Sequence, residues 1–433
     1  MASILFDVLT TTADDLRKLL EKGSVTRVRI VESYLSHIKA HNIRGAKCRA
    51  IISTGPRFQL IAQAAVLDEE RQHGKTWTEA IHPYWVQDRG QAPGGDGSST
   101  GSAVGVACGF APIALGTETS GSIVSPSAVA ALYALKLTPG SVPLTGIMEV
   151  TACFDTVGGM GKTPLDVALT SDALLGSAEG ASLASVASSV EFGRVSVGFV
   201  DIEKWRLPAG TQEDDPEYLQ QTAREYQAAK DELRKNGVKV VDVYIIPPEA
   251  YMIGDTNVDD LTDSIIRQQA KAGFERYLKA LKFSKVRSLE EVIEFNQAHA
   301  NVEFNNDYCP NQDGLVGILK ASRPDQDAAR SLEHCKRWAA TEGIDKAISE
   351  HGVDVVVCCS DSYFAGVSVA SRYPMAAVPL GYIKSSGRPY GLQAIAPAHQ
   401  EKKLVAFMAA WERIFPPRRV PDLDACAKAR ADW

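Results

Sequence analysis

The stretches GGDGSSTGS (94–102) and GTETSGSI (116–123) place Ser98 and Ser122 24 positions apart in two glycine-rich turns. A serine hydroxyl is a weak nucleophile until a base takes its proton and N–H groups hold the oxyanion that forms. Glycine exposes the backbone, so successive N–H groups of 119–122 can converge on one point. One such cluster by itself usually makes only a turn.

Three further blocks follow the serine turns in order: IVSPS (123–127), ALKLTPG (134–140) and FDTVGGM (154–160). Together with the two turns they resemble the signature of the amidase signature family, and the wording around both serines is similar to a branch common in fungi. The resemblance implies an α/β fold with a mixed central β-sheet covered by helices on both faces.

The resemblance also implies a reaction, the hydrolysis of an amide C–N bond. By position, Ser122 is the expected nucleophile and Ser98 the expected bridging serine. The backbone of Thr119, Ser120 and Gly121 supplies the expected oxyanion donors. The expected partner is a small-molecule amide, with no cofactor.

The strand that carries the family's catalytic lysine has no counterpart in this chain. AAVLDEER (64–71) resembles the helix before that strand, and GKTWTEA (74–80) resembles the segment beyond it, so we expect an internal deletion. Lys75 is the only lysine between Cys48 and Ser98. A flexible lysine titrates near ~10.4, and we interpret Lys75 as part of a solvated turn. We expect 76–91 to fill the space irregularly, with no lysine amine within reach of Ser98.

Three hypotheses stay open at this point. The chain is an amidase whose base comes from another residue, or it is an amidase-fold protein that binds a ligand or was repurposed in a secondary-metabolite pathway. Alternatively, the sequence lacks a segment that the gene encodes. All three predict that the Ser98 and Ser122 hydroxyls lie side by side at the mouth of one pocket.

The organisation predicts a single amidase-like domain over 1–433, with its signature core at about 90–180 and a variable, substrate-shaping region at about 180–320. Capping residues and periodicity predict helices from Thr12 to Gly23 and from Thr26 to about His41. The resemblance adds a closing strand pair near 373–382 and 387–393. The VKVVDV run (238–243) predicts a strand inside the variable region.

Composition narrows the function further. The formal net charge of −7 argues against a nucleic-acid partner, because such proteins normally show a basic face. We expect neither a secretory signal nor a membrane span, and therefore a cytoplasmic protein. A homodimer is left open.

Other motifs are weaker. The eight cysteines form no Cys-x-x-Cys pair, and we interpret Cys358 and Cys359 as buried strand residues. We interpret His37 and His41 as a solvated helix face, so no metal site is expected. The glycine-rich loop at 94–102 lacks the ending of a phosphate-binding loop. Ser99 centres a Gly-x-Ser-x-Gly pattern, but no partner histidine is recognisable.

Overall fold

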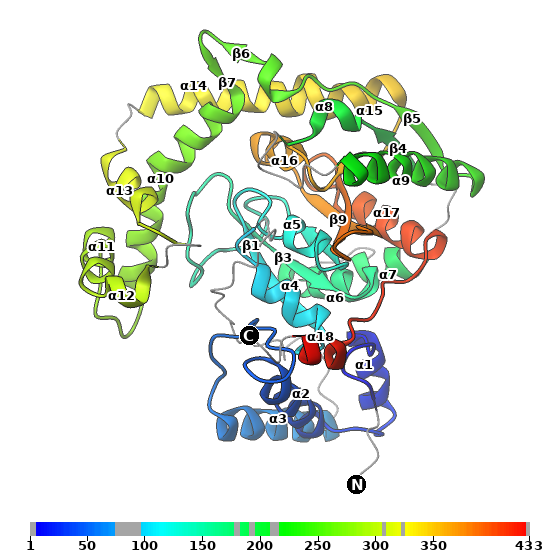
Figure 1. Ribbon diagram of the computed structural model, residues 1–433, viewed down its shortest axis with the longest axis vertical. Helices are drawn as coiled ribbons and strands as arrows, with labels where there is room; N and C mark the ends of the chain where they lie inside the picture. Colours follow the sequence, from blue (N-terminus) through cyan, green and yellow to red (C-terminus); the bar gives the residue numbers. More distant parts are fainter. Residues whose placement is uncertain are drawn as a thin grey trace.

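The computed structural model describes residues 6–73, 97–176, 182–189, 195–207, 216–304, 309–321 and 325–429. Within these ranges the main sheet has the strand order β1-β3-β2-β9-β10-β8-β4-β5 (Figure 1), and β6 and β7 form a separate pair. The strands are β1 (Ile113–Glu118), β2 (Tyr133–Lys136), β3 (Thr156–Gly161), β4 (Ser196–Phe199), β5 (Lys239–Asp242), β6 (Met252–Ile253), β7 (Thr256–Asn257), β8 (Val355–Cys359), β9 (Met375–Tyr382) and β10 (Pro389–Ile395).

Helices surround this sheet and extend from it. In the described ranges they are α1 (Ala13–Glu21), α2 (Arg27–His41), α3 (Arg57–Gln72), α4 (Thr100–Ala107), α5 (Val124–Ala128), α6 (Pro164–Leu175), α7 (Leu183–Ser188), α8 (Ile202–Trp205), α9 (Pro216–Lys235), α10 (Val258–Ala280), α11 (Leu289–Ala298), α12 (Ala300–Glu303), α13 (Asp313–Lys320), α14 (Asp325–Lys336), α15 (Asp345–His351), α16 (Phe364–Ser371), α17 (Glu401–Ile414) and α18 (Leu423–Ala429). Pro248–Ala250 forms a short 3₁₀ turn, and the π-helical stretch Arg337–Ile344 joins α14 to α15.

The sheet is mixed, as predicted. In the order in which the strands lie in the sheet, β1, β3, β2, β9, β10 and β8 each pair antiparallel with the next. The strand β4 pairs parallel with both β8 and β5. The strands β1, β2 and β3 come first in the chain, but in the sheet β3 lies between β1 and β2. Gly159 of β3 therefore pairs with Leu115 of β1 on one side and with Leu135 of β2 on the other.

Helices cover both faces of the sheet, which confirms the predicted α/β fold. Alternate positions of a strand point to opposite faces. A Cβ built on Gly159 would meet Thr170 of α6 at 3.0 Å, whereas a Cβ on Gly158 would meet Ile123, just before α5, at 3.1 Å. The helices α6 and α5 therefore lie on opposite sides of β3.

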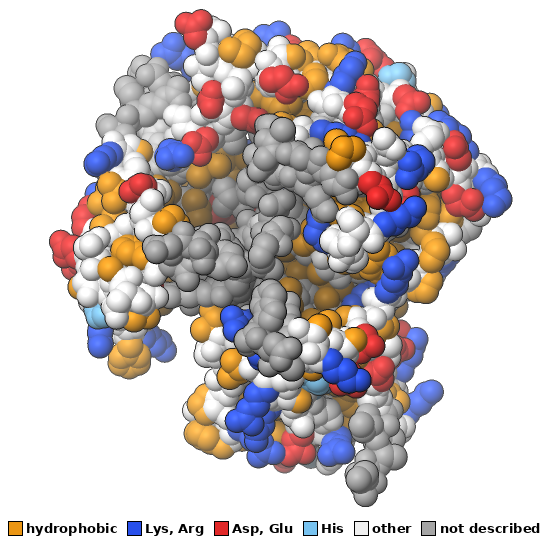
Figure 2. Space-filling model, in the orientation of Figure 1, with side chains coloured by type: hydrophobic (Ala, Val, Ile, Leu, Met, Phe, Trp, Pro, Cys, Tyr) orange, Lys and Arg blue, Asp and Glu red, His pale blue; other side chains and the backbone are white. Residues whose placement is uncertain are grey.

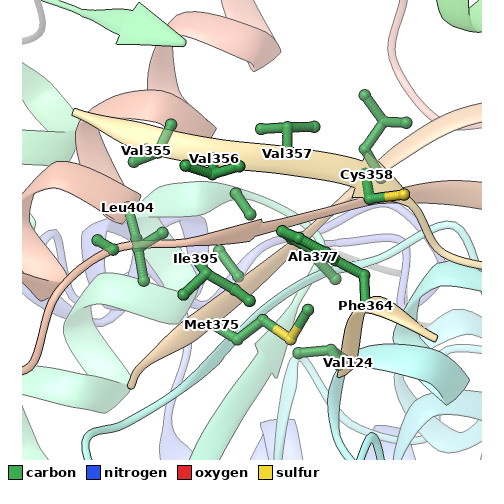
Figure 3. Packing of buried hydrophobic residues seen from close by; sticks show 14 of the residues in the cluster. Val124, Val355, Val356, Val357, Cys358, Phe364, Met375, Ala377, Ile395 and Leu404 are labelled. Carbon is green, nitrogen blue, oxygen red and sulfur yellow. The ribbon is translucent and has the colours of Figure 1, made fainter. Parts of the chain in front are cut away.

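The largest hydrophobic cluster lies between the sheet and these helices. Figure 3 shows Val355–Val357 of β8 with Ile395 of β10, Leu404 of α17 and Phe364 of α16 around them. Cys358 and Cys359, at the end of β8, are 0% and 1% exposed, which confirms their interpretation as buried strand residues.

The local predictions near the N-terminus are confirmed. Thr12 and Asp15 form a capping box at the start of α1, and Gly23 has a φ of +67° just after the helix. Thr26 caps α2, which ends at His41. With α3, these helices lie at one end of the molecule (Figure 1), and Phe6, Leu16, Leu20, Val25 and Tyr34 form a separate small cluster there.

The C-terminal strand pair is confirmed as β9 and β10, and the strand predicted at 238–243 is confirmed as β5. No helix in the described ranges is long and apolar enough to cross a membrane. On the face in Figure 2, acidic and basic side chains are interspersed.

The solvated helix face predicted for His37 is wrong. The His37 ring is half-buried, and its Nε2 lies 2.9 Å from the carbonyl oxygen of Cys108. Burial lowers the pKa of His37. In the part of the chain that the structure describes, no group of three His, Cys, Asp or Glu side chains could hold a metal ion.

Candidate active site

The Ser122 turn connects β1 to α5. The strand ends at Glu118, and Thr119, Ser120, Gly121 and Ser122 lead into the helix. Gly121 has a φ of +71°, a conformation that favours glycine, and a Cβ there would come within 3.0 Å of Ser125 Oγ. Ser120 is exposed and Ser122 is half-buried, so the turn opens to solvent at its tip.

The loop that carries Ser98 lies directly against this turn. The backbone N–H of Ser99 donates to the carbonyl oxygen of Ser122 at 3.1 Å. Gly97 has a φ of +131°, and a Cβ on it would meet Pro126 Cδ at 2.6 Å and Ser122 Cα at 3.1 Å. Ser98 is exposed and lies between these two contacts. The structure thus brings together the two serine turns that are 24 positions apart in sequence.

The contact between the turns is made by backbone. In the described ranges no hydrogen bond joins the Ser98 and Ser122 hydroxyls, and the pairing of these side chains stays a prediction. Catalytic hydrogen bonds are often long in the absence of substrate and tighten in the Michaelis complex.

Ser99 and Ser102 hold α4 against β1. Ser99 Oγ lies 3.2 Å from both the carbonyl oxygen and the N–H nitrogen of Thr117. Ser102 Oγ donates to the carbonyl oxygen of Leu115 at 2.8 Å. Ser99 is only 7% exposed. Its hydroxyl is engaged with the backbone of Thr117, which favours a structural role over the nucleophile elbow of its Gly-x-Ser-x-Gly pattern.

A buried ion pair holds the end of the Ser122 turn. Glu118 Oε2 accepts from the N–H groups of Ile123 at 2.7 Å and Val124 at 3.1 Å. Glu118 Oε1 lies 4.0 Å from Lys136 Nζ, and neither side chain is exposed. Lys136 Nζ also donates to Ser368 Oγ at 2.7 Å. This chain of contacts links the turn through the sheet to α16.

Burial disfavours the charge on Lys136. It lowers the pKa of Lys136 to about 8, although Glu118 and Asp155 favour the protonated amine. Neither Glu118 nor Lys136 was assigned a role from the sequence. A lysine inside the apolar run of 132–137 was the available signal, because lysine is rarely fully buried without a partner.

A carboxylate holds the other end of the turn. Thr119 Oγ1 donates to Asp155 Oδ1 at 2.7 Å, and the N–H of Val150 donates to Asp155 Oδ2 at 2.6 Å. Burial raises the pKa of Asp155, while these hydrogen bonds act in the opposite direction. The expected oxyanion turn is therefore fixed at Thr119 and at Ile123, with its exposed tip between them.

The structure brings no base to this site within the ranges it describes. No lysine there hydrogen-bonds to Ser98 or Ser122. Lys75 and the segment 76–91, for which we predicted a solvated turn and irregular filling, lie outside the described residues.

Comparison with known proteins shows which family and which proteins this chain is similar to. The family model described as Amidase matches residues 85–405. A probable amidase of Arabidopsis thaliana is 27% identical over 325 residues, which cover 75% of this chain and 61% of the relative. A putative amidase of Schizosaccharomyces pombe is 24% identical over 354 residues, covering 73% and 58%. The chain thus spans about 60% of the length of these two relatives.

The fold is also similar to solved structures. The native peptide amidase of Stenotrophomonas maltophilia superimposes with a TM-score of 0.79 at 24% identity, covering 96% of this chain and 99% of that one. An amidase family protein of Bacillus anthracis superimposes with a TM-score of 0.78 at 21% identity, covering 96% and 93%.

Proposed function

Because this chain belongs to the amidase family, we propose that it cleaves the C–N bond of a small-molecule amide with Ser122 as its nucleophile. The observation that carries the proposal is the hydrogen bond from the Ser99 N–H to the Ser122 carbonyl oxygen, at 3.1 Å. It joins the two serine turns and leaves Ser98 beside the Ser122 turn. Resemblance assigns Ser98 the bridging role.

The proposed reaction takes the roles of these residues from the family resemblance. Ser122 Oγ attacks the amide carbonyl carbon and gives up its proton through Ser98. The oxyanion of the tetrahedral intermediate is held by backbone N–H groups of Thr119, Ser120 and Gly121. The proton then passes to the departing amine, the C–N bond breaks, and an acyl ester remains on Ser122. Water hydrolyses this ester in the second half of the cycle.

The weak point of this cycle is the first proton transfer. We propose that the family's lysine is absent, which is supported by the lack of any described lysine at Ser98 or Ser122. Lys136 is engaged elsewhere, with Ser368 and Glu118. Without a base, an oxyanion hole and a binding pocket still retain ~10³–10⁴-fold acceleration over water in other serine hydrolases. We therefore expect slow turnover at neutral pH.

A serine-directed fluorophosphonate probe tests the nucleophile. We expect slow labelling of the wild type and none of Ser122→Ala, with the fold of the variant intact because a half-buried turn hydroxyl contributes little stability. Ser188→Ala is the matched control: Ser188 is an exposed serine of α7 whose hydroxyl donates to the carbonyl oxygen of Ala184 in the same helix. Labelling of Ser122→Ala at the wild-type rate would show that another residue is the nucleophile.

The lack of a lysine at Ser98 or Ser122 among the described residues also favours a second candidate, a non-hydrolytic member of the family that binds an amide or serves a secondary-metabolite pathway. The two candidates differ in their covalent chemistry. A protein that only binds amides would bind an amide ligand, but the fluorophosphonate probe would not label it at any pH. In the hydrolase, labelling of Ser122 by the probe would become faster as the pH rises.

A further inference from the structure

A cavity of about 470 Å³ lies between the N-terminal helices and the edge of the main sheet. Residues of α2 and α3 form one wall, and residues of α4, β1 and α6 form the other. Its larger side chains are apolar: Leu35, Ile38, Leu60, Val106, Phe110 and Leu115. The polar lining consists of serine and threonine, and the described lining holds no charged side chain. The cavity therefore favours a neutral, largely apolar occupant.

Gly105 leaves space on the α4 wall of this cavity. It lies inside the helix and is buried, yet a Cβ built on it would meet no atom within 4 Å. Glycine in a helix interior is less stable than alanine. A buried interior glycine ordinarily admits close packing, but here it enlarges an open volume. Glycine at position 105 therefore makes the helix less stable than alanine would, but it leaves volume that a ligand could occupy.

The sheet edge supplies a hydrogen-bond donor beside this space. The contacts of Thr117 with Ser99 and of the Leu115 carbonyl with Ser102 show that these residues direct their backbone groups away from β3. In an antiparallel strand the N–H and C=O of one residue point the same way. The N–H of Leu115 therefore also points outward, and it has no acceptor among the described residues.

We propose that this cavity is a binding site for a neutral, largely apolar small molecule that carries one hydrogen-bond acceptor, which takes the Leu115 N–H. Its volume falls in the range of small-molecule pockets, about 300–1,000 Å³. The site is separate from the reaction centre, because neither Ser98 nor any residue of the Ser122 turn lines it. Two elements connect it to that centre: α4, which follows Ser98 and Ser99 directly, and β1, which leads into the Ser122 turn.

A fluorescence titration with prodan (6-propionyl-2-dimethylaminonaphthalene) tests the site. Prodan is neutral, mainly apolar, carries a ketone acceptor and shifts to shorter wavelength in apolar surroundings. The full chain should show a saturable, one-to-one blue shift. Gly105→Leu should weaken binding at least ~10-fold, because the new side chain occupies the cavity while raising helix propensity.

The controls separate this proposal from loss of fold and from the proposed hydrolysis. Gly314→Leu, on α13, adds the same side chain where a Cβ also meets nothing within 4 Å, and it should bind prodan like the wild type. Leu60→Phe narrows the cavity from the α3 wall, and it should weaken binding if Gly105→Leu fails to fold. Ser122→Ala should leave binding unchanged.

Three outcomes would overturn the proposal. They are no saturable binding to the wild type, wild-type binding by folded Gly105→Leu or Leu60→Phe, and loss of binding in Ser122→Ala, which would place the probe in the reaction pocket. None of these measurements requires turnover, so hydrolysis and this site can fail independently.

Discussion

At the scale of single residues, a buried charge pair lies behind the Ser122 turn. Glu118 holds the two N–H groups that follow Ser122, and Lys136 lies 4.0 Å from its other oxygen. Sequence reasoning identified Ser98 and Ser122 through their turns and the family resemblance. It missed Glu118 and Lys136 because their meeting depends on the pairing of β1 and β2 with β3, which no local pattern encodes.

Replacing Lys136 should cost much of the fold's stability. Lys136→Met leaves the Glu118 carboxylate buried without its cation, and breaking one partner of such a pair typically costs about 3–5 kcal/mol. Urea denaturation measures the loss. The double variant Glu118→Gln, Lys136→Met should recover part of it. A Lys136→Met variant as stable as the wild type would contradict the buried pair.

The same lysine gives a pH signature. Burial holds the pKa of Lys136 at about 8, below its ordinary value of 10.5. Between these values the unfolded chain binds more protons at Lys136 than the folded chain does, so this group's contribution to the free energy of unfolding rises with pH. Relative to Lys136→Met, the wild type should gain up to about 3 kcal/mol across this window. A flat difference in urea titrations would show that the amine is not desolvated.

At the scale of elements, α4 is joined to the outer edge of β1 by serine hydroxyls. Strong local signals predicted α1, α2 and β5, because caps, periodicity and apolar runs act within each segment, whereas β9 and β10 were predicted from the family resemblance. The order β1-β3-β2 joins segments far apart in sequence, and the contact of α4 with β1 depends on serine hydroxyls that reach the backbone of the neighbouring strand. The strand order could be expected only from the family resemblance. The roles of Ser99 and Ser102 could not be expected even from that resemblance.

Ser99 should therefore matter for stability and not as the nucleophile. Ser99→Ala leaves the Thr117 N–H and carbonyl without their partner, which should cost about 1–3 kcal/mol in urea denaturation. Ser188→Ala, on the surface, should stay within about 0.5 kcal/mol of the wild type. Fluorophosphonate labelling of folded Ser99→Ala should persist. Its loss, with labelling retained in Ser122→Ala, would assign the nucleophile to Ser99.

At the scale of the whole molecule, one mixed sheet brings both serine turns to one place and keeps the N-terminal helices at its β1 edge (Figure 1). The family model matches from residue 85 onward, so α1 to α3 lie outside the matched range. The resemblance predicted the fold class because its blocks span the chain. The cavity beside β1 could not be foreseen, since it depends on how α2 and α3 pack against α4 and α6.

The most direct test of the central claim is to find the acyl group. The chain is incubated with an activated aryl amide from about pH 7 to about pH 10, quenched with acid, and digested for peptide mass spectrometry. We expect the acyl group on Ser122, formed slowly at neutral pH and faster without a plateau as hydroxide replaces the missing base. It should be absent from Ser122→Ala. An acyl group on another residue, or equal acylation of Ser122→Ala, would contradict this account.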